Sequence, residues 1–128
     1  MFNDAYPIDV AHYGAKAMRV EHWSILIVTK SSQNVFTRKE TAQAHAHQIS
    51  GSTTDYYIKT PQDVSDVLKS TAYLGMVKVG SIPKDHLENA QRVVQDTPVI
   101  LNNTSWDCRY WVISALQCLQ NEGYNTFS

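Results

Sequence analysis

This chain has no excess of basic charge, no long apolar run and only two cysteines. The formal net charge is only -1 and charged residues make up 18% of the 128 residues, so no excess of basic side chains points to a nucleic-acid partner. The longest apolar run, residues 23–28 with Ser24 inside it, is far too short to span a bilayer. The first four residues lack the basic and apolar regions of a signal peptide. We therefore expect a cytoplasmic protein with neither a nucleic-acid nor a membrane partner.

The chain has two cysteines, Cys108 and Cys118. They lie on one predicted helix at a separation of about 15 Å by the helical rise, so they cannot form a disulfide with each other. Both are expected to be free thiols. The length predicts a single domain over residues 1–128 with one hydrophobic core, and it leaves the oligomeric state open.

The order of apolar segments predicts an α+β domain in which a small antiparallel sheet packs against helices. Residues 20–29 are β-branched and aromatic, which is typical of a central strand. Further strands are expected at residues 33–37, 42–50, 55–60 and 73–79. Residues 1–19 contain Pro7 and Gly14 and show no clear period, so they are expected to form an irregular N-terminal arm.

Capping residues and prolines predict three helices. The first runs from Pro61 to Leu68, after a capping threonine. The second is opened by residues 81–83 and continues to about Gln95, with Leu87, Ala90 and Val94 facing inward. The third begins at Cys108 and is closed by Gly123.

The start of the last helix is the most informative part of the chain. Apolar residues recur at positions 108, 111, 112, 115, 116 and 119, which is the spacing of a buried helical stripe. The Cys108 thiol therefore lies in the first turn of a core helix. Unpaired amide N–H groups and the positive end of the helix dipole stabilise a thiolate there, and they also stabilise an oxyanion formed on an attacked carbonyl.

A nucleophilic thiol needs a general base, and the base needs a third group that fixes its tautomer. His22, near the start of the strongest predicted strand, is the leading candidate for the base. His47 on a neighbouring strand could orient the His22 ring. His45 shares a strand face with His47 by the two-residue period and is the alternative.

Three segments carry a resemblance to a known superfamily. They are Glu-His-Trp at 21–23, Val-Lys-Val-Gly-Ser-Ile-Pro at 77–83, and Asp-Cys-Arg-Tyr-Trp-Val at 107–112. A histidine strand, then a sheet, then a cysteine that opens a helix resembles the circularly permuted papain-like branch, to which NlpC-type peptidases, lecithin:retinol acyltransferase-like proteins and PPPDE-type isopeptidases are related. The segments are most similar to small fungal proteins with a V-G-x-I-P linker and an N-C-Q-x-W-V helix start. Asp107 and Arg109 depart from that pattern, where asparagine and glutamine are usual.

The resemblance implies that Cys108 is the nucleophile, His22 the base and His47 the third residue. The implied chemistry is attack on an amide, ester or thioester carbonyl of a small substrate, through an acyl-enzyme that passes to water or to another acceptor. No cofactor is expected. A zinc site built from His45, His47 and Cys108 is disfavoured, because no second cysteine or carboxylate falls at a ligand spacing.

Aromatic residues flank the proposed nucleophile and base, namely Trp23, Trp106 and Trp111. They could line an apolar pocket for the substrate, or they could simply belong to the core. Arg109 could lower the pKa of the thiol or bind a substrate carboxylate. Two alternative functions remain open: a tailoring enzyme that cyclises, condenses or isomerises a small secondary metabolite in the same pocket, and a non-catalytic binding module with an inert thiol.

Overall fold

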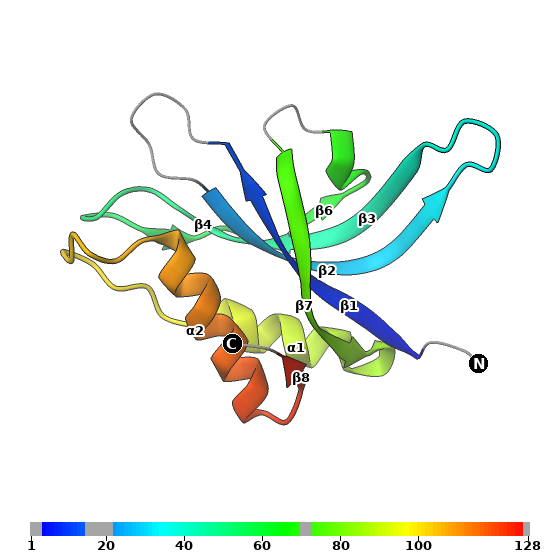
Figure 1. The fold of residues 1–128 in the computed structure, drawn as a ribbon. Coiled ribbons are helices and arrows are strands. Elements are labelled where there is room, and N and C mark those ends of the chain that lie inside the picture. The colour runs from blue at the N-terminus through cyan, green and yellow to red at the C-terminus, as the bar shows by residue number, and fades with distance from the viewer. Residues whose placement is uncertain (1–3, 15–21, 70–72, 127–128) are drawn as a thin grey trace.

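The computed structural model describes residues 4–14, 22–69 and 73–126 (Figure 1). These residues form an α+β fold in which a six-stranded antiparallel sheet carries two helices on one face. The strand order is β6-β3-β2-β1-β7-β8, and a separate two-stranded sheet joins β4 and β5. The six strands are β1 (Ala5–Tyr13), β2 (His22–Gln33), β3 (Glu40–His47), β6 (Gln62–Val64), β7 (Tyr73–Pro83) and β8 (Asn125–Thr126). The remaining elements are β4 (Ile49–Ser50), β5 (Tyr57–Ile58), α1 (Leu87–Gln95), α2 (Cys108–Asn121) and the 3-10 turns η1 (Val67–Lys69) and η2 (Lys84–His86).

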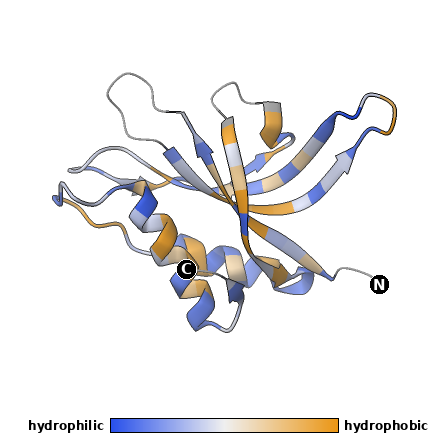
Figure 2. Ribbon diagram, viewed as in Figure 1, coloured by the Kyte–Doolittle hydropathy of each residue, from blue (hydrophilic) through white to orange (hydrophobic). Residues whose placement is uncertain are grey.

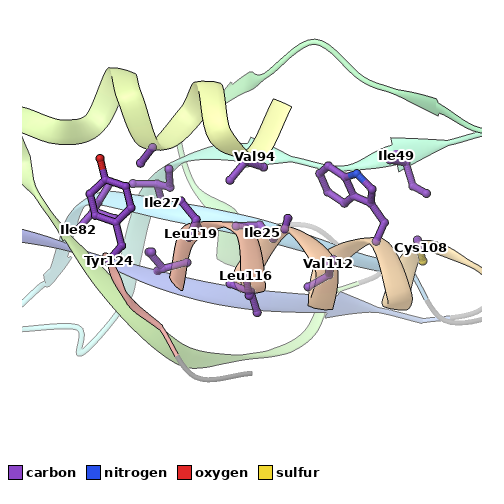
Figure 3. Packing of buried hydrophobic residues seen from close by; sticks show 14 of the residues in the cluster. Ile25, Ile27, Ile49, Ile82, Val94, Cys108, Val112, Leu116, Leu119 and Tyr124 are labelled. Atoms are coloured by element: carbon purple, nitrogen blue, oxygen red, sulfur yellow. The ribbon is translucent and has the colours of Figure 1, made fainter. Parts of the chain in front are cut away.

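Side chains alternate between two layers along β2. Ile25 and Ile27 face the helices and join the larger core cluster, whereas Leu26 and Val28 face the opposite side. Figure 3 shows the buried stripe of α2 packed beside Ile25 and Ile27. Both helices carry apolar and polar stretches in alternation, as expected of amphipathic helices that cover a sheet (Figure 2). The opposite side is filled by small residues of β3 and by Val67 of η1.

The N-terminal segment is not the irregular arm that we expected. Residues 5–13 form β1, which lies between β2 and β7 near the centre of the sheet. The period-two alternation is present in Tyr6, Ile8 and Val10, all of which contact the helix-side core. Pro7 and the brevity of the pattern concealed it. Residues 1–3, 15–19 and the expected strand start at 20–21 lie outside the described residues.

Two further expectations are wrong. Residues 34–37 form a hairpin turn instead of a strand, because the Asn34 side chain accepts hydrogen bonds from the backbone N–H groups of Phe36 and Thr37 at 2.8 and 3.0 Å. The segment 61–68 is not a helix. It forms β6 and η1, because Gln62–Val64 pairs with residues 44–46 of β3, and strand pairing outweighs the capping signal there.

The later elements follow the sequence more closely. α1 begins at Leu87, because residues 81–83 stay paired with β1, but its inward residues Ala90 and Val94 are buried as predicted. α2 begins at Cys108 and ends before Gly123, which has a φ of 96°. No helix in the described part of the chain is both long and apolar enough to cross a bilayer.

Gly80 provides a test of how β8 is held on the sheet. A Cβ atom at this position would lie 2.2 Å from the Asn125 carbonyl oxygen and 2.9 Å from the Thr126 Cα. Since both are backbone atoms, Gly80→Ala must displace β8, and we expect the free energy of unfolding to fall by about 2 to 3 kcal/mol. Urea denaturation followed by circular dichroism measures this loss.

Gly123→Ala is the matched control. A Cβ there meets no atom within 4 Å, so only the positive φ is strained and the expected loss is about 1 kcal/mol. Equal losses in the two variants would contradict the close approach of β8 to Gly80.

Candidate functional site

Cys108 opens α2, as the sequence predicts. Asp107 is the N-cap residue, with extended backbone angles, and its side chain accepts a hydrogen bond from the Arg109 backbone N–H at 2.9 Å. The cap sets the first residue of the helix, and the apolar stripe below it is buried against the sheet. The cysteine itself is only 6% exposed, and both cysteines are free thiols.

The thiol lies beside the first residues of β2. The backbone N–H of Trp23 is directed at the sulfur. In an antiparallel sheet the N–H groups of Trp23 and Ile25 point to the same side. Strand β3 pairs with β2 only as far as Ile25, opposite His47, so the Trp23 amide is left unpaired by β3 and faces the first turn of α2.

Opposing effects act on the ionisation of Cys108. Burial raises the pKa of the thiol, and the Asp107 carboxylate raises it further. The Trp23 N–H, the Arg109 guanidinium and the N–H of Cys108 itself lower it. The net pKa is raised, so the resting group is the neutral thiol. A reaction at this sulfur therefore requires a proton acceptor.

His22 is at the same end of β2 but on the other face. Its Nε2 atom is hydrogen-bonded to Gln48 Oε1, and its ring centroid is 6.1 Å from that of Tyr13. Because side chains alternate along the strand, this ring emerges on the side opposite to Trp23. The Gln48 amide in turn donates to Gln62 Oε1 at 3.1 Å, which fixes the Gln48 oxygen toward His22.

His47 does not orient His22, contrary to our expectation. It is fully buried between β3 and α1, where Nε2 donates to Gln91 Oε1 at 3.0 Å and Nδ1 accepts from Gln95 Nε2 at 2.8 Å. These bonds fit a neutral ring, and burial lowers the pKa of His47 to about 4. The two rings belong to opposite faces of the sheet. Spacing along the chain located both histidines on strands but did not give the face of each.

His45 does not replace His47 in that role. Its Nδ1 atom lies 2.5 Å from an Asp63 carboxylate oxygen across the β3–β6 pair. Within the residues that the structure describes, no three His, Cys, Asp or Glu side chains are close enough to hold a metal ion together.

The residues expected to bind a substrate divide into two groups. Trp111 is fully buried and donates its indole N–H to the Thr97 carbonyl at 3.0 Å, so it belongs to the core and does not line a substrate surface. Trp106 lies in the same core cluster as Cys108 and Trp23 packs against it, and the Trp106 ring meets Tyr56 edge to face at 5.5 Å. Arg109 is bound to Asp107 by a bidentate ion pair, whose shortest contact is 2.7 Å.

Sequence reasoning missed Gln48 and Tyr56. Burial raises the pKa of the Tyr56 phenol, and the Asp107 carboxylate and an ionised Cys108 raise it further, because the phenol lies near both groups. Tyr56 begins a short aromatic pair next to a turn, a weak signal for a site. Nothing in the sequence marks Gln48, because its contact with His22 depends on where strand β3 stops pairing with β2.

Asp107→Asn is expected to make Cys108 more reactive. Asparagine caps a helix as well as aspartate does, but it removes the negative charge that raises the pKa of the thiol. Alkylation of Cys108 by iodoacetamide at pH 7 should become several-fold faster, as measured by mass spectrometry. Arg109→Gln removes a charge of the opposite sign and should slow the reaction. A change in the same direction in both variants would be inconsistent with these charges acting on the sulfur.

His47 predicts an acid-sensitive fold. Its pKa is about 4 when folded and about 6.5 when unfolded, so protonation favours the unfolded chain. The stability that the neutral ring provides is complete above about pH 6.5 and is lost as the pH falls toward 4, by up to about 3 kcal/mol. In His47→Gln this part of the pH dependence should disappear from the free energy of unfolding measured with urea. An unchanged pH profile would mean that His47 titrates normally.

Comparison with known proteins identifies a family without giving an activity. No curated protein and no solved structure matches the chain. One family model matches residues 8–126, which include all the strands, helices and candidate site residues described above except the first residues of β1. The chain therefore belongs to DUF6914, a family of unknown function.

Proposed function

We propose that the protein is a cysteine-dependent acyl hydrolase or acyltransferase in which Cys108 attacks the carbonyl of a small substrate and His22 accepts the thiol proton. The observation that carries the proposal is the Trp23 amide, whose N–H is directed at the Cys108 sulfur. That amide nitrogen is bonded to the His22 carbonyl carbon. The sulfur therefore lies within roughly 6 Å of the His22 Cα, from bond lengths and one hydrogen-bond distance.

An imidazole on that Cα can reach the sulfur by rotation. Turning about the Cα–Cβ bond carries the ring from Gln48 around the strand edge that β3 leaves open after His47. The hydrogen bond to Gln48 Oε1 puts the ring proton on Nε2, so Nδ1 carries the lone pair of the neutral ring. The base nitrogen in this proposal is Nδ1, and the Gln48–Gln62 pair sets the tautomer before the ring turns toward the sulfur.

The reaction proceeds in two halves. His22 Nδ1 takes the thiol proton as the Cys108 sulfur bonds to the carbonyl carbon, and the oxyanion that forms is stabilised by the N–H groups of Cys108 and Trp23. The tetrahedral adduct collapses when the imidazolium returns its proton to the leaving group. Water or another acceptor then attacks the thioester, again with His22 as the base.

The circularly permuted papain-like architecture is part of the same proposal. It is supported by the order of the elements, since the strand that carries His22 precedes most of the sheet and the helix opened by Cys108 follows it. The antiparallel sheet with helices on one face is compatible with that architecture.

A non-catalytic binding module is the second candidate. Two observations favour it: the raised pKa of the buried Cys108 thiol, and the Gln48 contact that holds His22 on the other face of β2. The two candidates differ in whether an acyl group is transferred to the sulfur.

A generic acyl donor separates them. We expect p-nitrophenyl acetate to acetylate Cys108 and leave Cys118 of the same helix unmodified, as read by peptide mass spectrometry. His22→Ala should slow acetylation by about 100-fold or more, because a positioned base contributes at least that factor. His45→Ala is the matched control, since His45 pairs with Asp63 and should leave the rate unchanged. Slow modification of both cysteines, unaffected by His22→Ala, would establish the inert module.

A further inference from the structure

The hairpin between β2 and β3 forms an exposed arm, defined as residues 30–40. Every side chain in this arm is exposed, and the arm extends away from the two helices (Figure 1). Its tip carries Val35 and Phe36, which are 81% and 91% exposed and are the most exposed large apolar side chains among the described residues. Figure 2 shows this apolar tip between hydrophilic strand ends. Two adjacent apolar side chains that are exposed to solvent indicate a docking surface.

The tip is held in one conformation. The Asn34 side chain accepts from the N–H groups of Phe36 and Thr37, and the Asn34 backbone is bonded to Arg38 and Lys39 at 2.8 and 2.9 Å. These bonds close the turn before anything binds to it. A preorganised turn loses little conformational entropy on docking, so its two apolar side chains are presented to a partner at low cost.

Charge is distributed unevenly between the arm and the rest of the chain. Three basic residues, Lys30, Arg38 and Lys39, and one acidic residue, Glu40, give the arm a net charge of +2. The whole chain has a net charge of -1, so the remainder carries -3. A negatively charged surface therefore attracts the arm and repels the rest of the molecule, which orients the tip toward it.

We propose that the arm docks on an anionic phospholipid bilayer, with Val35 and Phe36 at the boundary between headgroups and acyl chains and with Arg38 and Lys39 near the lipid phosphates. A bilayer is favoured over a protein because a convex tip of two residues offers far less than the roughly 800 Å² per partner of a stable protein interface. A fluid bilayer can accommodate a convex apolar tip without a pocket of matching shape. Combining inserted apolar side chains with basic ones is how weak, reversible membrane attachment is achieved.

The arm is independent of the Cys108 site. Its tip follows Gln33, the end of β2 that lies roughly 35 Å from His22 by the strand rise, so docking leaves the thiol clear of the bilayer. The sequence predicted no membrane partner because its longest apolar run is too short to span a bilayer. A two-residue tip on a hairpin does not lengthen that run.

Co-sedimentation of the full chain with vesicles of phosphatidylcholine and phosphatidylserine tests the proposal. We expect binding that weakens with salt and that falls about fivefold for each of Arg38→Gln and Lys39→Gln, because one basic residue near the surface is worth about that factor. The double variant Val35→Ser with Phe36→Ser should bind at least about tenfold more weakly. Val77→Ser is the matched control, since Val77 is 61% exposed on β7, outside the arm, and its loss should leave binding unchanged.

Insertion of the tip has a separate readout. Phe36→Trp should add tryptophan fluorescence that brominated lipids quench, whereas Val77→Trp should not. A wild-type chain that ignores phosphatidylserine vesicles would overturn the proposal and leave an acidic protein as the occupant of the arm. Binding that survives in the Val35 and Phe36 double variant would overturn it as well. Neither result depends on the chemistry of Cys108.

Discussion

The alternation of side chains along β2 is the constraint on which the core and the candidate site both depend. Trp23, Ile25 and Ile27 of β2 lie in or against the core cluster that holds the buried stripe of α2, and this packing fixes where the helix lies along the strand. The first turn of α2 is thereby brought to the start of β2, beside the Trp23 amide. The same alternation sends the neighbouring His22 ring to the opposite face. One strand thus positions the thiol and separates it from the imidazole in this conformation.

The early end of the β2–β3 pairing determines which backbone amide reaches the Cys108 sulfur. While β3 pairs with β2, each outward amide of β2 is consumed by the ladder, but the pairing ends opposite Ile25. The Trp23 N–H then becomes available to the sulfur, where it opposes the effect of burial on the thiol pKa. Burial prevails, so the sulfur is protonated at rest. In the proposed mechanism the base approaches along the edge of β2 where its pairing with β3 has ended.

The sequence predicts some elements of the fold well and others poorly. The helix at Cys108 was predictable from its start to Gly123, because a 3.6-residue stripe, a cap and a stop signal agree over a long segment. Strand β1 was not, because a short alternation containing Pro7 becomes a strand only through pairing on both sides. Cys108 could be recognised as a candidate because the same signals place it in the first turn of this helix. The facing of His22 and His47 is a property of sheet register, which spacing alone does not give.

Hydrogen bonds to glutamine side chains distinguish His22 from His47, both of which the sequence predicts on strands. His47 has both ring nitrogens committed, one donating to Gln91 and one accepting from Gln95, and such a ring holds α1 to the sheet with its lone pair occupied by the Gln95 N–H. His22 has its Nε2 proton committed to Gln48, and the lone pair stays on Nδ1. A base must keep a lone pair, whereas a buried structural histidine must satisfy both nitrogens. The number of ring nitrogens bonded to amides therefore assigns a structural role to His47 and is consistent with His22 as the base in the proposed mechanism.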